Sequence, residues 1–326
     1  MQLQSLSKLV PALSDSLLGG SAPRLRSIRL NYIPFPGLPK LLSSTSDLVH
    51  LDLRNVPESG YISPETMVTS LSSLTQLKIL GLGFQPSRSR PGLKPRYPSP
   101  QAHVFLLNVT HFRFQGVSEY LERLVAYINA PSLHSVKITL FNELSSDISE
   151  FPQFIDRSEQ FRSLNRADLG FFMDSVKLKF SPQTRTADGL ILALSISCEE
   201  SDWHPSSLSH VFGSSLPPLA TSERLEIHAS SWLSQRQYDM RNIQWLDPLR
   251  PFTAVKDLHL SEKVAVHVAP ALEDVAEGSV EKVLPFLRNI FLEGLQRAGP
   301  VQEASGKFAS RQLSNYPIAV HCWERQ

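Results

Sequence analysis

The sequence is poor in cysteine, has almost no net charge and contains no long apolar run. Only two cysteines, Cys198 and Cys322, occur in 326 residues, which argues against a disulfide scaffold and favours a cytoplasmic or nuclear compartment. The 32 basic and 31 acidic residues give a formal net charge of +1, so there is no global field that would favour nucleic acid or a membrane surface. Neither a signal peptide nor a membrane span is expected, because no apolar stretch is long enough.

The short motifs of common enzymes are also missing. No GxSxG, HExxH or DFG sequence occurs, and Gly81-Leu82-Gly83 lacks both the third glycine of a dinucleotide fingerprint and the lysine of a P-loop. His321 and Cys322 are adjacent, so on a strand they point to opposite faces and do not form a nucleophile pair. We therefore expect no catalytic residues, no cofactor and no enzyme activity, with a hydrolase as the less favoured alternative.

One short segment holds several potential metal ligands, namely Cys198, Glu199, Glu200, His204 and His210. Structural zinc sites usually contain close ligand pairs such as CxxC or HxxxH, and this segment has none. We expect Cys198 to end a buried strand and no metal to bind, and a zinc enzyme stays as an alternative.

What the chain does contain is a repeated apolar pattern of the form LxxLxL, with other apolar residues allowed. Copies start at residues 25, 48, 77, 109, 133, 164, 191, 222, 255 and 287, an average interval of about 29 residues, which fits a long leucine-rich repeat. The last two apolar positions of each copy are two residues apart and face one side of a short strand. The pattern predicts an α/β, leucine-rich-repeat-like solenoid, a horseshoe with a curved parallel sheet of about ten strands.

Helix signals lie between the predicted strands. Ser63, Pro64 and Glu65 read as an N-cap, a first-turn proline and a first-turn acid. Ser118 begins a second amphipathic segment that Pro131 closes. Weaker helices are expected over 208–216, before Pro217-Pro218, and around 280–284.

The predicted domain organisation has few breaks. Residues 1–22 are expected to form a helical cap or entry segment, and residues 23–326 a single solenoid. Within it, 85–100 is expected to be a mobile proline-rich basic loop, 167–180 a hairpin insertion, and 301–326 a C-terminal cap. The loop is a second candidate for binding through its basic and aromatic side chains, although a solvated insertion is the favoured interpretation; these residues are Arg88, Arg90, Lys94, Arg96 and Tyr97.

The main candidate binding surface is the exposed, concave side of the strands. If positions four and six of LxxLxL point inward, then positions three, five and seven point outward. The outward residues are mainly basic in the first five repeats and more acidic in the last five, which predicts a charge gradient that would steer a protein partner. The candidate residues are Arg29, His50, Asp52, Arg54, His111, Arg113, Lys137, Arg166, Asp168, Arg224, Glu226, Asp257, His259 and Glu293.

Three strings of the sequence resemble a large family of basidiomycete F-box proteins. They cover Ser215–Ile227, Phe252–Asp274 and Leu284–Gln326, the last of which ends LSNYPIAVHCWERQ. The resemblance runs through nearly the whole chain and implies a protein-protein interaction scaffold, the substrate-recognition region of a cullin-type ubiquitin ligase.

Members of this family usually begin with an F-box, which binds the Skp adaptor of the ligase. No Leu-Pro-x-Glu helix start of an F-box occurs before Leu25. Binding of a Skp adaptor is therefore expected only if an F-box lies upstream. The alternative is a stand-alone leucine-rich-repeat binding protein with no link to a ligase. In both cases we expect a monomer with a protein partner, no membrane and no nucleic acid.

Overall fold

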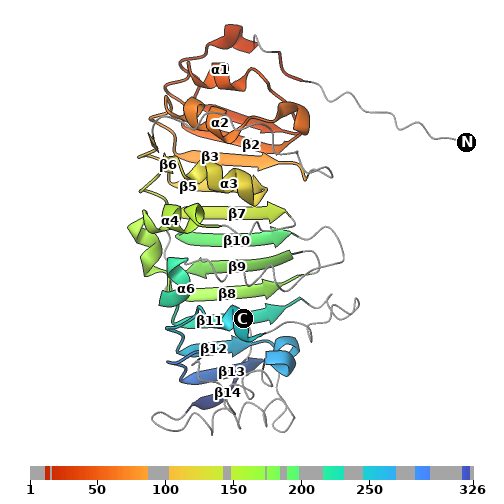
Figure 1. The fold of residues 1–326 in the computed structure, drawn as a ribbon, viewed down its shortest axis with the longest axis vertical. Helices are drawn as coiled ribbons and strands as arrows, with labels where there is room; N and C mark the ends of the chain where they lie inside the picture. The colour runs from red at the N-terminus through yellow and green to blue at the C-terminus, as the bar shows by residue number, and fades with distance from the viewer. Residues whose placement is uncertain are drawn as a thin grey trace, which may run out of the picture. The chain divides into compact units, whose positions relative to one another are not determined.

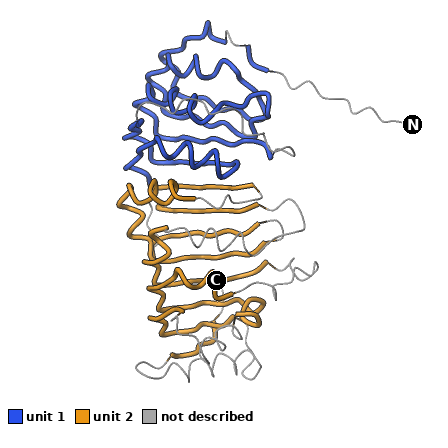
Figure 2. Tube along the Cα trace, in the orientation of Figure 1, with its two compact units in different colours: residues 1–133 blue, residues 134–326 orange. Residues whose placement is uncertain are grey.

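The chain is a mixed α/β protein whose strands form a large, mostly parallel sheet of twelve strands (Figure 1). It divides into two compact units, residues 1–133 and 134–326 (Figure 2). None of the helices in the described part of the chain is both long and apolar enough to cross a membrane. The computed structural model describes residues 12–14, 17–86, 103–141, 148–172, 175–183, 189–197, 216–230, 245–268, 283–293 and 318–323.

In the first unit, the strands of the main sheet follow one another in chain order and are parallel, β1-β2-β3-β5. Their bounds are β1 Ser27–Asn31, β2 His50–Val56, β3 Ile79–Phe84 and β5 His111–Gly116. A separate pair joins β4 Val104–Phe105 to β6 Ile128–Asn129. The helices are α1 Leu38–Leu42, α2 Pro64–Leu71 and α3 Ser118–Val125, with 3-10 turns at η1 Leu17–Gly20 and η2 Glu58–Gly60.

The start of α2 confirms the capping prediction. The Ser63 side-chain oxygen accepts a hydrogen bond from the backbone N–H of Thr66, and Pro64 occupies the first turn. Proline is suited to this position because its missing N–H would have no partner inside the helix. The helix α3 begins at Ser118, as expected, and ends at Val125.

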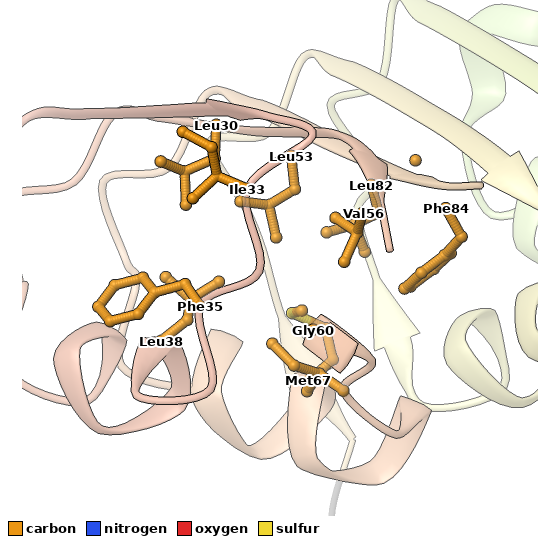
Figure 3. A pocket seen from close by; sticks show the side chains of 12 residues that line it. Leu30, Ile33, Phe35, Leu38, Leu53, Val56, Gly60, Met67, Leu82 and Phe84 are labelled. Atoms are coloured by element: carbon orange, nitrogen blue, oxygen red, sulfur yellow. The ribbon is translucent and has the colours of Figure 1, made fainter. Parts of the chain in front are cut away.

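The repeat leucines of the first unit form its core. Leu51, Leu80 and Phe112 lie opposite one another in register, and each is nearly fully buried. Figure 3 shows the neighbouring row, with Leu53 and Leu82 on the side of the sheet that faces Met67 of α2. Positions four and six of the repeat therefore point inward in this unit, as predicted. Each such side chain stabilises the fold by about 1.5–3 kcal/mol through burial.

A small internal gap lies in this core, between the strands and the first two helices (Figure 3). Its volume is about 10 Å³ and its lining is apolar, with Phe35, Leu38 and Met67 among the contributing side chains. One water needs at least about 10–15 Å³ and several polar partners. The gap is therefore a packing defect of the core and has no room for a ligand.

In the second unit, the order of the strands in the sheet is β7-β10-β9-β8-β11-β12-β13-β14. Their bounds are β7 Ser135–Phe141, β8 Arg166–Phe171, β9 Ser175–Ser181, β10 Ile191–Ser197, β11 Arg224–Ala229, β12 Asp257–Leu260, β13 Asn289–Glu293 and β14 Ala319–Trp323. Short helices at α4 Glu150–Asp156, η3 Glu159–Ser163, α6 Pro217–Thr221 and α7 Leu246–Leu249 connect them.

The second unit departs from a simple repeat at β8, β9 and β10, which we call the meander. Strand β9 pairs antiparallel with both β8 and β10, and β10 returns to lie parallel to β7. The segment between Phe171 and Ser175 is too short for the crossover that a parallel pair needs, so the chain must turn back. The prediction of about ten strands in a parallel sheet was therefore wrong in number and in the direction of β9, although an antiparallel pair does lie at 167–180.

Several other expectations meet the structure only in part. Residues 17–20 form a 3-10 turn, and most of the expected N-terminal helix 1–22 lies outside the described residues. Pro217 and Pro218 lie in the first turn of α6, a position that suits proline. The helix expected over 208–216 lies outside the described residues except for Leu216. The expected helix around 280–284 reaches the described part of the chain at Val283 and Leu284, which lie in a bend with a φ of 52° at Leu284. Strand β14 falls where an edge strand was expected and is last in the sheet order.

Candidate binding face of the sheet

In both units the outward residues of the strands form a row of charged and aromatic side chains, here called the sheet face of each unit. All fourteen candidates predicted on the strands lie on it. They are Arg29 on β1, His50, Asp52 and Arg54 on β2, His111 and Arg113 on β5, Lys137 on β7, Arg166 and Asp168 on β8, Arg224 and Glu226 on β11, Asp257 and His259 on β12, and Glu293 on β13. The loop candidates Arg88, Arg90, Lys94, Arg96 and Tyr97, and the cluster from Cys198 to His210, lie outside the described residues.

In the first unit the sheet face is organised around a buried acid, Asp52, which is only 5% exposed. Arg54 binds its Oδ2 through two nitrogens, at 2.9 and 2.6 Å. The other oxygen, Oδ1, is buried and has no hydrogen-bond partner. Asp52 lies over Gly81 of the next strand, where a Cβ atom would collide with Oδ1. Glycine at position 81 therefore makes the burial of this carboxylate possible.

Two further side chains extend this cluster. A nitrogen of the Arg29 guanidinium lies 3.0 Å from Nδ1 of His50, and Nε2 of His50 lies 4.0 Å from Asp52. Burial, followed by the charge of Arg29, lowers the pKa of His50. The hydrogen bond to Asp52 raises the pKa of Arg54. At neutral pH the cluster thus carries two arginine charges against one carboxylate, with a neutral imidazole between them.

The sheet face of the first unit is nearly bare along β3. Two of its three outward residues, Gly81 and Gly83, have no side chain, and only Ile79 has one; Arg113 and Gln115 follow on β5. Arg113 is exposed and forms no hydrogen bond with the described residues. The face therefore presents a basic strip with open backbone beside the Asp52 cluster.

In the second unit, Glu226 is the most deeply buried acid, at 2% exposure. An Arg166 nitrogen donates to its Oε2 at 2.8 Å, and Arg224 lies 4.0 Å from the same atom. Burial lowers the pKa of Arg224, and the neighbouring Arg166 lowers it further. The two guanidinium groups compensate the charge of Glu226 in a partly desolvated setting, where such pairs are stronger than on an open surface.

Next to this pair, Asp168 faces His228. Nδ1 of His228 lies 3.2 Å from Oδ1 of Asp168, although it is not aligned for a hydrogen bond. His228 packs over Gly170, where a Cβ would lie 2.7 Å from its Nε2, and its ring meets Phe172 edge to face at 5.9 Å. Gly170 and Phe172 therefore fix the position of this imidazole.

Asp168, Glu226 and His228 also have ligand atoms within 4.8 Å of one another, a spacing that could hold a metal ion. Two carboxylates and one imidazole are plausible donors. However, Arg166 already donates to Glu226 and Arg224 lies 4.0 Å from the same oxygen, so a divalent cation would be placed beside two guanidinium charges. The geometry fits an ion-pair network better than a metal centre.

A hollow of about 380 Å³ opens on the same face, over β10. Small outward residues, Ala193 and Ser195, form its floor. Basic side chains and the rings of Phe172 and His228 stand around it, and the Lys177 ammonium lies 4.5 Å from the centre of the Phe172 ring. The outward residues that line it are Lys137, Thr139, Asp168, Gly170, Phe172, Lys177, Lys179, Ala193, Ser195 and His228.

Towards the last strands the face becomes aromatic. His259 stacks on Phe291 with ring centres 4.2 Å apart, and Phe291 stacks on His321 at 4.9 Å. Trp323 meets His259 edge to face at 4.9 Å. Burial lowers the pKa of His259 to about 4, and the charge of Arg224 adds to this. His259 is therefore neutral at physiological pH and serves as part of an apolar stack.

This face also holds four residues that were not among the candidates predicted from the sequence, namely Lys177, Lys179, Phe291 and Trp323. The signal for the lysines was present, since Ser175–Ser181 alternates polar and apolar residues with a period of two. The segment carries no LxxLxL pattern and therefore was not read as a face-forming strand. The two lysines lie among the last five repeats, whose outward residues were expected to be more acidic than those of the first five, and they add two basic side chains there.

The chain was compared with protein-family models, with curated proteins and with solved structures. None of the three comparisons gives a match.

Proposed function

We propose that this chain is a recognition module, a leucine-rich-repeat-like array whose sheet face binds another protein. The observation that supports it best is the ordering of charges on that face. In each unit a buried carboxylate, Asp52 or Glu226, is held by arginines that are themselves a third or more exposed. Charged groups fixed in this way give specificity and fast association more than raw affinity, which is what a protein-binding surface needs.

The F-box resemblance gives this proposal its more specific form. By that resemblance the bound protein is the substrate of a cullin-type ubiquitin ligase, and the chain is the receptor part. The alternative is a stand-alone binding protein with no ligase link. Co-purification of a Skp adaptor with a chain extended upstream, where an F-box would lie, would favour the first form.

The hydrolase alternative has one structural feature to weigh, the pair of Asp168 and His228. Ser261 follows β12 beside His228 and has a buried hydroxyl with no hydrogen bond. Yet Nε2 of His228 is the ring atom closest to Gly170 on β8, on the other side of β11. A nucleophile must be within about 3.2 Å of its base, so this arrangement does not make a catalytic triad.

The proposal is tested by reversing charge on and off the sheet face. Proteins retained by the wild-type chain are identified by mass spectrometry, purified and measured one by one. Arg113→Glu and Lys179→Glu change the sheet faces of the first and second units. Lys40→Glu on α1 and Arg162→Glu on η3 make the same reversal at exposed sites outside the sheet.

We expect at least one sheet-face variant to weaken binding of a purified partner by about tenfold, as the loss of a charged interface contact does. The control variants should bind as the wild type does. Equal binding by all four folded variants would refute the sheet face as the binding surface.

A further inference from the structure

The side chains that line the hollow over β10 carry more positive than negative charge. Lys137, Lys177 and Lys179 are exposed and form no ion pair with the described residues. The single carboxylate in the lining, Asp168, faces His228 at 3.2 Å. Elsewhere on the sheet face of the second unit, Glu226 is paired with Arg166. The three lysines therefore carry positive charge that no acid among the described residues neutralises in an ion pair.

The strand register places these lysines around one point. Ala193 of β10 lies between Lys137 of β7 and Lys179 of β9, and Ser195 lies opposite Lys177. Neighbouring strands are about 4.8 Å apart, so the two flanking strands are about 10 Å apart. Because β10 carries only small side chains, lysines from both sides can lean inward over it. In the next row of the sheet, Ser195 lies between Thr139 of β7 and Lys177 of β9.

Contacts with two aromatic rings restrict the side-chain positions on one side of the hollow. The Lys177 ammonium lies over the Phe172 ring at 4.5 Å, a cation–π contact that holds it at the edge of the hollow. Phe172 in turn packs edge to face on His228, which is 8% exposed and also lines the hollow. The Nδ1 atom of His228 is buried without a hydrogen bond. These contacts fix the side of the hollow formed by Lys177, Phe172 and His228.

The charge of the lining selects among anions. Three lysines and one aspartate leave a net charge of about +2. A phosphate monoester carries about −1.5 to −2 at neutral pH and offers three strong acceptor oxygens. A carboxylate brings one charge and two oxygens. Ammonium groups also suit a tetrahedral anion, whereas the planar fork of arginine suits a carboxylate.

We propose that this hollow binds a phosphate monoester on a serine or threonine side chain of the partner protein. This rests on the proposed function and adds that the partner is recognised in its phosphorylated form. The rest of the partner would lie across the charged rows formed by β8, β11 and β12.

The test uses the full chain and a degenerate peptide array with a central phosphoserine, together with the same array carrying serine. Lys137→Gln with Lys179→Gln removes two of the charges, and Lys179→Arg keeps the charge at one of them. Lys40→Gln with Lys78→Gln is the matched control, since both are exposed lysines of the first unit. Circular dichroism and thermal unfolding establish that each variant is folded.

We expect at least a tenfold preference for phosphorylated peptides over their serine counterparts. The preference should fall at least tenfold in the Lys137/Lys179 variant, and it should persist in Lys179→Arg and in the control. Equal binding of the two arrays, or a preference that the double variant keeps, would overturn the proposal. Free phosphoserine or inorganic phosphate that binds as tightly as the best peptide would also overturn it, in favour of a small phosphorylated ligand.

Failure of this proposal can be told apart from failure of the proposed function. A purified partner that still binds after phosphatase treatment, but is lost on Arg113→Glu or Lys179→Glu, leaves the sheet face as the binding surface and removes the phosphate site. A partner that no sheet-face variant affects removes both.

Discussion

The two units differ in how the charged side chains on their sheet faces are paired. In the first unit the strands follow chain order, and the glycine at 81 leaves room for the Asp52 carboxylate to be buried beside Arg54. In the second unit the meander interrupts that order and adds Lys177 and Lys179 around a hollow. The regular unit thus carries a self-contained ion-pair cluster, while the irregular unit carries charge that is not paired.

The difference lies in the antiparallel strand β9, which the second unit adds. A regular repeat places each outward side chain next to an equivalent one, and the chain can balance their charges locally. An added antiparallel strand brings residues that belong to no repeat. Substitutions in the two units test this contrast.

The largest effects are expected from the buried leucines of the repeats. Leu53→Ala in the first unit and Leu258→Ala in the second should each reduce the free energy of unfolding by about 2–5 kcal/mol, through lost burial and the cavity left behind. In a repeat architecture the damage should stay near the substituted strand. Hydrogen exchange measured by mass spectrometry would show this, and equal loss of protection in both units for either variant would contradict it.

The buried acids should differ in their contribution to stability. Glu226→Gln leaves Arg166 and Arg224 facing each other in a partly buried place, and we expect a loss of about 2–3 kcal/mol. Asp52→Asn leaves Arg54, which is 55% exposed and can be hydrated, so about 1 kcal/mol is expected. Denaturant unfolding measures both. Arg162→Gln breaks an exposed pair with Asp156 and should change little; a larger loss for Asp52→Asn than for Glu226→Gln would refute this ranking.

A third effect depends on pH and involves only the second unit. His259 has a pKa of about 4 in the folded chain, lowered by burial, against about 6.5 when unfolded. Below pH 6.5 the unfolded chain therefore binds a proton that the folded chain does not, and stability falls as the pH falls towards 4. We expect a loss of at most about 2 kcal/mol over this range, since solvent screens part of the effect.

His259→Phe separates this term from the other titrating groups. Phenylalanine keeps the stack on Phe291 but takes up no proton. The difference in unfolding free energy between variant and wild type should grow in favour of the variant as the pH falls from 6.5 to 4. A difference that stays constant over that range would show that His259 is not responsible.

The smallest effect concerns association. Arg54 and Arg113 look equivalent in the sequence, as outward basic residues of the repeats, but Arg54 is bound to Asp52 and Arg113 is not. Arg113→Glu should leave the thermal midpoint unchanged and slow association with the partner several-fold at low salt. Arg54→Glu should lower the midpoint because it places an acid beside Asp52. Stopped-flow and calorimetric measurements would separate them, and equal midpoints would contradict the assignment.

The parts of the fold that the sequence predicted are those with local causes. The alternation around Leu51 and Leu53 determined which residues face outward, and Ser63 with Pro64 located the start of α2. The exchange of β8 and β10 has no local signal, because both segments carry the same apolar spacing and either could lie beside β7. The depth of burial could not be predicted from the sequence either. Glu226 is only 2% exposed because of neighbouring strands about sixty and thirty residues away in the chain, and the residues around it carry no sign of this.

The exchanged order of β8 and β10 has a consequence for how this region forms. The meander joins strands that are close in the chain, whereas β7 with β10 and β8 with β11 join segments more than fifty residues apart. Local pairings close first because their loop entropy is small. The meander should therefore assemble early and β11 should join it later, while β7 waits for an already formed β10. A chain arrested between these steps would expose both outer edges of a three-stranded sheet, and such edges are prone to pair with other chains. The segment most exposed to pairing with other chains during folding would then be the middle of this chain, and not either end.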